Sequence, residues 1–155
     1  MNSESSSPAP ELYIVPDEAP EKAGGPSAGR VLFSDDDETN RTLLKIAMEM
    51  EGFEVVTTEN GREGLDVLRN EGRAAFDVLL VDLMMPEVDG VTMIREARKS
   101  LGYSNPIIVY SGVDREETIQ KAIDAGADRI LNKPVGLADL VSELKQIMKA
   151  SAAAR

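Results

Sequence analysis

Five polar residues follow short apolar runs of this sequence within three positions, and their side chains carry groups that bind cations or phosphoryl oxygens. Asp35 and Asp36 follow one run, Asp82 a second, Ser111 a third, and Lys133 comes two residues after a fourth. A lone carboxylate after a strand is usually only a charged loop residue. If these runs are neighbouring strands, however, the groups share one crevice, at a cost in repulsion and desolvation unless something binds there.

The apolar pattern switches repeatedly between the periods of strands and helices. Apolar runs predict strands at 31–33, 53–58, 77–82, 107–110 and 129–131. Helical periodicity predicts helices at 39–51, 61–70, 90–99 and 115–125, and a last helix striped by Leu137, Leu140, Val141, Leu144 and Ile147. In the first helix, Leu43, Leu44, Ala47 and Met48 are expected to face the core.

Strands that alternate with helices in this way predict an α/β fold, a doubly wound five-stranded parallel sheet with helices on both faces. Parallel strands present their carboxyl ends on one edge, where open α/β sheets bind ligands. The run 78–81 is apolar at every position, which is typical of a strand buried on both faces, and it ends at Asp82. We therefore expect the five polar side chains to meet at this edge.

The composition narrows the chemistry of such a crevice. The chain has no histidine and no cysteine, which excludes an imidazole base, a thiolate nucleophile and a phosphohistidine of its own. Oxygen ligands without nitrogen or sulfur favour a hard cation such as Mg²⁺, whose coordination shell a phosphoryl group can complete. Lys133 and Ser111 would then hold the remaining phosphoryl oxygens, as a point charge and a hydrogen-bond donor.

The length of the chain and the composition of its first 29 residues indicate one domain with a tail. The 155 residues suffice for one domain, expected at 30–150 with a short extension at 151–155. Residues 1–29 are rich in Ser, Pro and Gly and are expected to be a disordered tail. The apolar stretch Leu12-Tyr13-Ile14-Val15 within it is either an extended linker, an added strand or a docking motif.

The chain is also expected to be soluble and cytoplasmic. It has neither a secretory signal nor a stretch long enough to cross a membrane. A net charge of −11 opposes binding to nucleic acid and favours protein partners or cations.

In order and spacing, these motifs resemble the receiver domain of two-component response regulators, over residues 30–150. The motifs are Asp35-Asp36, Asp82 followed by Met85-Pro86 and Asp89-Gly90, Ser111-Gly112, and Lys133-Pro134. The resemblance implies a flavodoxin-like fold with strand order 2-1-3-4-5. It further implies a phosphorelay in which a sensor histidine kinase or histidine phosphotransfer protein donates the phosphoryl group and an effector protein responds.

The resemblance also implies a role for each residue of the motifs. Asp82 is the expected phosphoacceptor, and Asp36, Asp82 and the backbone carbonyl of Met84 are expected to bind Mg²⁺ directly, with Asp35 helping through water. Ser111 and Lys133 are expected to contact the phosphoryl group, and the Lys133–Pro134 peptide is expected to be cis. Three further acids are given structural roles: Asp37 as a polar loop residue, Glu38 as a first-turn acid and Asp89 as a helix N-cap.

One position departs from the family pattern. Receivers usually carry a Tyr or Phe in the fifth strand that moves together with the Ser or Thr, and here that residue is Ile130. Ile130 has no polar tip and is β-branched, so it is expected to stay buried in both states. Either the switch then runs from Ser111 through the loop 112–115 into the helix 115–125, which the freedom of Gly112 favours, or phosphorylation shifts the populations of the two states less.

Specific residues of the sequence disfavour three other functions. A nucleotide-binding domain would need a glycine-rich first turn, and Asp35 and Asp36 are its electrostatic opposite. A phosphatase of the haloacid dehalogenase type would need a second Asp at the position of Met84. A pseudo-receiver that is not phosphorylated is disfavoured by the intact set of five residues. With no effector domain after Arg155, the output is expected to be a protein contact, or the chain is a fragment of a larger regulator or hybrid histidine kinase.

Overall fold

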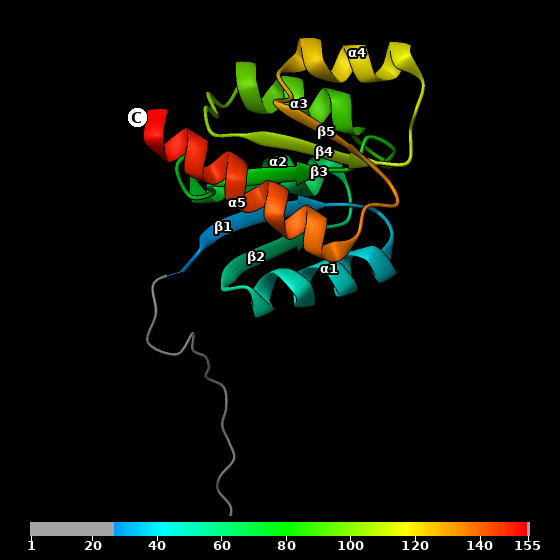
Figure 1. Ribbon diagram of the computed structural model, residues 1–155. Helices are drawn as coiled ribbons and strands as arrows, with labels where there is room; N and C mark the ends of the chain where they lie inside the picture. The colour runs from blue at the N-terminus through cyan, green and yellow to red at the C-terminus, as the bar shows by residue number, and fades with distance from the viewer. Residues whose placement is uncertain (1–26, 155) are drawn as a thin grey trace, which may run out of the picture.

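A single parallel sheet forms the centre of the molecule (Figure 1). The computed structural model describes residues 27–154, and residues 1–26 and 155 lie outside the described part. The strands are β1 (Gly29–Ser34), β2 (Phe53–Thr58), β3 (Val78–Val81), β4 (Ile107–Ser111) and β5 (Arg129–Asn132). Their order is β2-β1-β3-β4-β5 and all neighbours are parallel, which confirms the predicted fold and strand order.

The helices cover both faces of the sheet. They are α1 (Glu38–Met50), α2 (Gly61–Glu71), α3 (Gly90–Lys99), α4 (Glu116–Ala125) and α5 (Leu137–Ala154). The buried side chains of α1 and α5 pack with one face of the sheet, and those of α2, α3 and α4 pack with the other (Figure 1). This is the arrangement that helical crossovers between parallel strands produce.

The central strand β3 shows why the site lies where it does. All four of its residues are fully buried; Leu79 and Val81 belong to one core and Val78 and Leu80 to the other. A strand without a polar face is stable only in the middle of a covered sheet. Asp82, the next residue, is therefore carried to the middle of the carboxyl edge.

Three acidic residues, Asp37, Glu38 and Asp89, lie at the starts of α1 and α3. Asp89 caps α3 by accepting the Thr92 N–H at 2.8 Å, and Glu38 lies in the first turn of α1, as predicted. Asp37 lies in the loop before α1, as predicted, but its carboxylate also accepts the backbone N–H groups of Thr39 and Asn40 and so caps α1, a role that the prediction missed. Asp37 thus satisfies two of the donors that a helix start leaves open.

The inward face of α1 is narrower than its apolar stripe. Leu44 and Met48 are buried as predicted, but Leu43 is 52% exposed, which contradicts its predicted place in the core. Leu44 and Met48 are one helical turn apart and make the contact with the sheet, while Leu43 lies on the flank of the helix. An apolar strip of α1 therefore remains outside the core.

The observed ends of the domain differ slightly from the predicted boundaries. Gly29, assigned to the tail, begins β1, and α5 continues through residues 151–154, which were assigned to an extension. The rest of the predicted tail, 1–26, lies outside the described residues. Within 27–154, no helix is both long enough and apolar enough to cross a bilayer.

Gly90, the first residue of α3, packs closely against the backbone that follows the central strand β3. A Cβ placed on Gly90 would lie 2.4 Å from the carbonyl oxygen of Asp82 and 2.6 Å from the Cα of Leu83. We predict that Gly90→Ala lowers the free energy of unfolding by roughly 1–3 kcal/mol, because these backbone atoms cannot move aside cheaply. Urea denaturation measures the change.

Gly112→Ala is the control for this prediction, because nothing lies within 4 Å of a Cβ at Gly112. It should cause no loss of stability. Equal losses in the two variants would contradict the close-packing argument.

Candidate functional site

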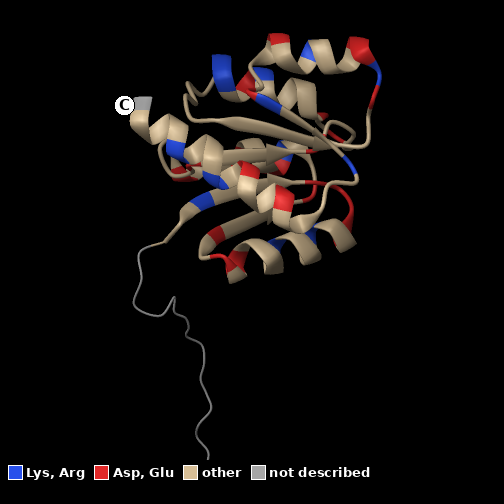
Figure 2. Cartoon of the chain, in the orientation of Figure 1, with Lys and Arg blue, Asp and Glu red and all other residues tan. Residues whose placement is uncertain are grey.

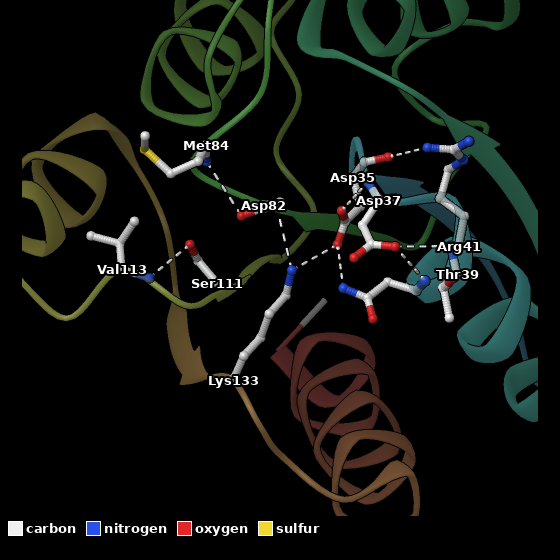
Figure 3. A network of polar contacts seen from close by, with 10 residues as sticks. Asp35, Asp37, Thr39, Arg41, Asp82, Met84, Ser111, Val113 and Lys133 are labelled. Atoms are coloured by element: carbon white, nitrogen blue, oxygen red, sulfur yellow. Dashed lines mark hydrogen bonds and ion pairs between the residues drawn. The ribbon is translucent and has the colours of Figure 1, made fainter.

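Four of the predicted polar residues, Asp35, Asp82, Ser111 and Lys133, meet at the carboxyl edge of the sheet (Figure 3). Asp35 follows β1, Asp82 follows β3, Ser111 ends β4 and Lys133 follows β5. Backbone hydrogen bonds hold three of them to neighbouring strands: Asp35 N–H to Thr58, Asp82 N–H to Ser34, and Lys133 N–H to Ser111. The site is thus fixed to the rigid part of the fold, and acidic residues gather in the loops around it (Figure 2).

Burial divides the acids of the site into two layers. Asp35 is 0% exposed and Asp82 is 5% exposed, whereas Asp36 is exposed. An open cavity of about 400 Å³ lies over Asp82. Its lining residues are Asp36, Asp37, Asp82, Met84, Ser111, Gly112, Val113 and Lys133. Asp35 lies outside this lining, so the cavity presents Asp36 and Asp82 to a ligand.

Lys133 connects the two buried carboxylates. Its Nζ lies 3.0 Å from Asp35 Oδ2 and 3.5 Å from Asp82 Oδ2. The same Nζ lies 5.3 Å from the ring centroid of Tyr110, within the range of a cation–π contact. The Lys133–Pro134 peptide is cis, as the family resemblance implied. Lys133 therefore offsets part of the negative charge at the floor of the cavity.

The surroundings shift the pKa values of this pair. Burial raises the pKa of the Asp82 carboxyl, the charge of Lys133 lowers it and the charge of Asp35 raises it again, and the net direction is upward. Burial alone would lower the pKa of the Lys133 ammonium, but its hydrogen bond to Asp35 and the charges of Asp82 and Asp35 outweigh burial and raise it. Lys133 therefore stays protonated at neutral pH, and an additional cation would stabilise the Asp82 carboxylate.

Three carboxylates offer oxygens to such a cation. One oxygen each of Asp35, Asp36 and Asp82 lies within 4.8 Å of the others. With Lys133, these groups carry a formal net charge of −2 when the acids are ionised, which a divalent ion would balance. Oxygen-only donors match the preference of Mg²⁺. The residues present thus fit the ion that the sequence predicted.

The remaining carboxylate contacts orient the acids. Asp35 Oδ1 accepts the Asp37 N–H at 2.8 Å, and Asp82 Oδ1 accepts the Met84 N–H at 3.3 Å. Met84 extends its side chain outward and is 63% exposed. The segment that follows Asp82 thus bends back onto the carboxylate and places the Met84 backbone beside it.

Ser111 lies at the base of the loop between β4 and α4. It is 1% exposed, and its Oγ accepts the Val113 N–H at 3.2 Å, which leaves the hydroxyl hydrogen able to donate. Ile130 was predicted to be buried, and this was wrong in degree, because Ile130 is only partly buried. It lies on β5, the edge strand of the sheet, and within residues 27–154 no further strand pairs with the outer flank of β5.

Three supporting residues were missed in the sequence. Arg41 donates to the backbone carbonyl of Asp35 at 2.7 Å, and Asn40 Nδ2 lies 3.5 Å from Asp35 Oδ2. Tyr110 provides the ring beside Lys133. Asn40 and Arg41 lie in the first turn of α1, where a polar side chain is ordinarily solvated. Their contacts with Asp35 depend on how closely α1 approaches the end of β1, which the sequence pattern does not show.

The sequence matches one family over most of its length. The model of the response regulator receiver domain family covers residues 31–145. The nisin biosynthesis regulatory protein NisR of Lactococcus lactis subsp. lactis is 34% identical over 120 residues, which are 77% of this chain and 50% of that protein. The chain thus spans about half the length of the curated relatives it matches.

Solved structures show the same fold. A CheY-like receiver domain protein from Methanospirillum hungatei JF-1 has a TM-score of 0.76 at 28% identity, over 81% of this chain and 98% of that one. The receiver domain of a signal transduction histidine kinase from Syntrophus aciditrophicus has a TM-score of 0.69 at 26% identity, over 79% of this chain and 91% of that one. With the sheet, the strand-edge acids and the family match in agreement, this chain belongs to the response regulator receiver domains of two-component signalling.

Proposed function

We propose that Asp82 accepts a phosphoryl group from a phosphohistidine on another protein, either a sensor histidine kinase or a histidine phosphotransfer protein. The observation that carries this proposal is the position of Asp82, a buried carboxylate that opens into a cavity with Lys133 and Ser111 on its rim. The donor histidine must belong to a partner, because this chain has none. A cytoplasmic location, expected from the sequence, belongs to the same proposal.

The proposed reaction is a phosphoryl transfer between two nucleophiles. An oxygen of the ionised Asp82 carboxylate forms a bond to phosphorus, the bond between phosphorus and the imidazole nitrogen breaks, and the imidazole leaves with the electron pair. Lys133 keeps its proton and offsets negative charge on the transferred oxygens. The Ser111 hydroxyl donates to one of them once the acyl phosphate has formed.

The proposed metal is Mg²⁺. A bound Mg²⁺ offsets charge on the phosphoryl oxygens. Asp36, Asp82 and the backbone carbonyl of Met84 would hold it directly, and Asp35 would contribute through water. The cluster of three carboxylates supports this assignment, and Asp36 is its exposed member on the cavity rim.

The proposed output is a change of the surface formed by α4, β5 and α5. An acyl phosphate adds charge and acceptor oxygens beside Ser111, and the loop from Gly112 to Arg115 leads from there into α4. The recipient would be an effector protein or another part of a larger regulator or hybrid histidine kinase. A phosphatase is not favoured, because Met84 stands where a second acid would be needed.

The proposed function is tested with a small phosphodonor. We predict that acetyl phosphate with Mg²⁺ adds one phosphoryl group to the chain and that Asp82→Asn blocks the addition, because an amide is a poor nucleophile. Asp89→Asn is the matched control, since Asn still caps α3 and Asp89 lies outside the cavity lining. Intact-mass analysis reads the outcome, and undiminished labelling of Asp82→Asn would refute the assignment.

The metal assignment is tested with a pair of serine substitutions. Asp36→Ser is expected to abolish Mg²⁺ binding by removing a direct ligand, whereas Asp37→Ser should retain binding and the cap of α1. Amide chemical shifts during a Mg²⁺ titration report both. The shifts should cluster at Asp36, Asp82 and Met84, and a cluster elsewhere would mean that the site is misplaced.

The switch is tested with beryllofluoride as a phosphoryl mimic. We expect the rates of amide hydrogen exchange to change from Gly112 to Ala125, because this loop adjoins Ser111 directly. Ile130 is expected to keep its partly buried position. Changes confined to residues that touch the phosphoryl group would contradict a switch through this loop.

A further inference from the structure

An apolar strip remains uncovered on one side of the described domain. Of its six exposed large hydrophobic side chains, Leu43, Ile46 and Met50 lie on α1 and Leu137 begins α5, with exposures of 52%, 51%, 81% and 42%. Scattered single residues of this kind would need no explanation, but grouped ones mark a surface that binds something. None of the four lines the cavity over Asp82.

Met50 and Leu137 line a groove between α1 and α5, which pack on the same face of the sheet (Figure 1). The groove has a volume of about 570 Å³. Its lining includes Ala47, Met50, Leu137, Ala138, Val141 and Lys145. Lys145 forms an ion pair with Glu51 at 2.9 Å, so this part of the lining is polar. We call this feature the α1–α5 groove.

The described chain begins beside the same end of α1. The Ala28 N–H donates to the Gly52 carbonyl at 3.0 Å, and Gly52 comes two residues after Met50. Any segment that precedes Ser27 is therefore tethered close to the α1–α5 groove. Tethering raises the effective concentration of such a segment far above that of a separate molecule.

The preceding 26 residues contain a single run of four large apolar side chains, Leu12-Tyr13-Ile14-Val15. Eleven residues, 16–26, separate this run from Ser27. At about 3.3 Å per residue they can span up to roughly 36 Å. Leu137 to Lys145 extends only about 12 Å along the helix at about 1.5 Å per residue. The tether is therefore long enough for the run to reach any part of the groove.

We propose that Leu12-Tyr13-Ile14-Val15 docks in the α1–α5 groove of its own chain. The run supplies the apolar side chains that Met50 and Leu137 lack as neighbours. A protein partner that binds this face must then displace the run, which makes the N-terminal segment a competitor for the surface.

The first test compares two double substitutions in the full chain. Leu12→Ser with Ile14→Ser removes the apolar contacts of the run. Glu21→Ser with Lys22→Ser is the matched control, because it changes two residues of the same segment without altering the net charge. Amide chemical shifts at 46–51 and 137–145 are expected to change with the first pair and to stay unchanged with the control.

The reciprocal test changes the groove. Met50→Ser should shift the amides of residues 12–15, whereas Ile123→Ser, which removes a 45% exposed side chain on α4, should not. Both positions are exposed, so neither variant is expected to disturb folding. Peroxide oxidation gives a second readout: Met50 should form its sulfoxide more slowly than the exposed Met84, and the Leu12 and Ile14 double variant should accelerate Met50 alone.

Three results would overturn the proposal. Unchanged groove amides in the Leu12 and Ile14 variant would show that the run does not bind there. Changes along β2 instead would mean that the run adds to the sheet edge. Changes that disappear on dilution would mean that the groove takes the segment of a second copy.

Discussion

The contact of Lys133 with two buried carboxylates is the interaction on which the site depends. Asp35 and Asp82 lose nearly all their hydration at the sheet edge, and an uncompensated pair of this kind is expensive in an apolar surrounding. Lys133 follows the edge strand β5, and its side chain reaches both carboxylates across the end of β4, where Ser111 lies. Its single positive charge reduces the formal charge of the three ionised acids from −3 to −2, and this remaining negative charge suits a divalent cation.

The same patterns that build the core also place the site. The apolar run from Val78 to Val81 is stable only at the centre of a covered sheet, so Asp82 must lie in the middle of the carboxyl edge. Gly90 then brings the start of α3 against the Asp82 backbone, which fixes that side. A Cβ at Gly112 would meet nothing within 4 Å, which supports our proposal that the loop beginning there moves when a phosphoryl group is added at Asp82.

The sequence therefore predicted the strands, the helices and the convergence of the acids, because each depends on local period and strand direction. The strand order was known only through the family resemblance. The errors concern side chains whose surroundings are set by packing. Leu43 lies on the flank of α1, and Ile130, on the edge strand β5, is only partly buried. The cap that Asp37 makes for α1 was missed for the same reason. Arg41 was missed because its role depends on where α1 meets β1.

The most direct test of the account identifies the residue that carries the phosphoryl group after transfer from a phosphohistidine protein. Borohydride reduces an acyl phosphate to an alcohol, so reductive trapping followed by peptide mass spectrometry marks the acceptor. The account predicts homoserine at position 82 and at no other acid. Trapping at Asp35 or Asp36, or a label that survives as a phosphate ester on Ser111, would contradict it.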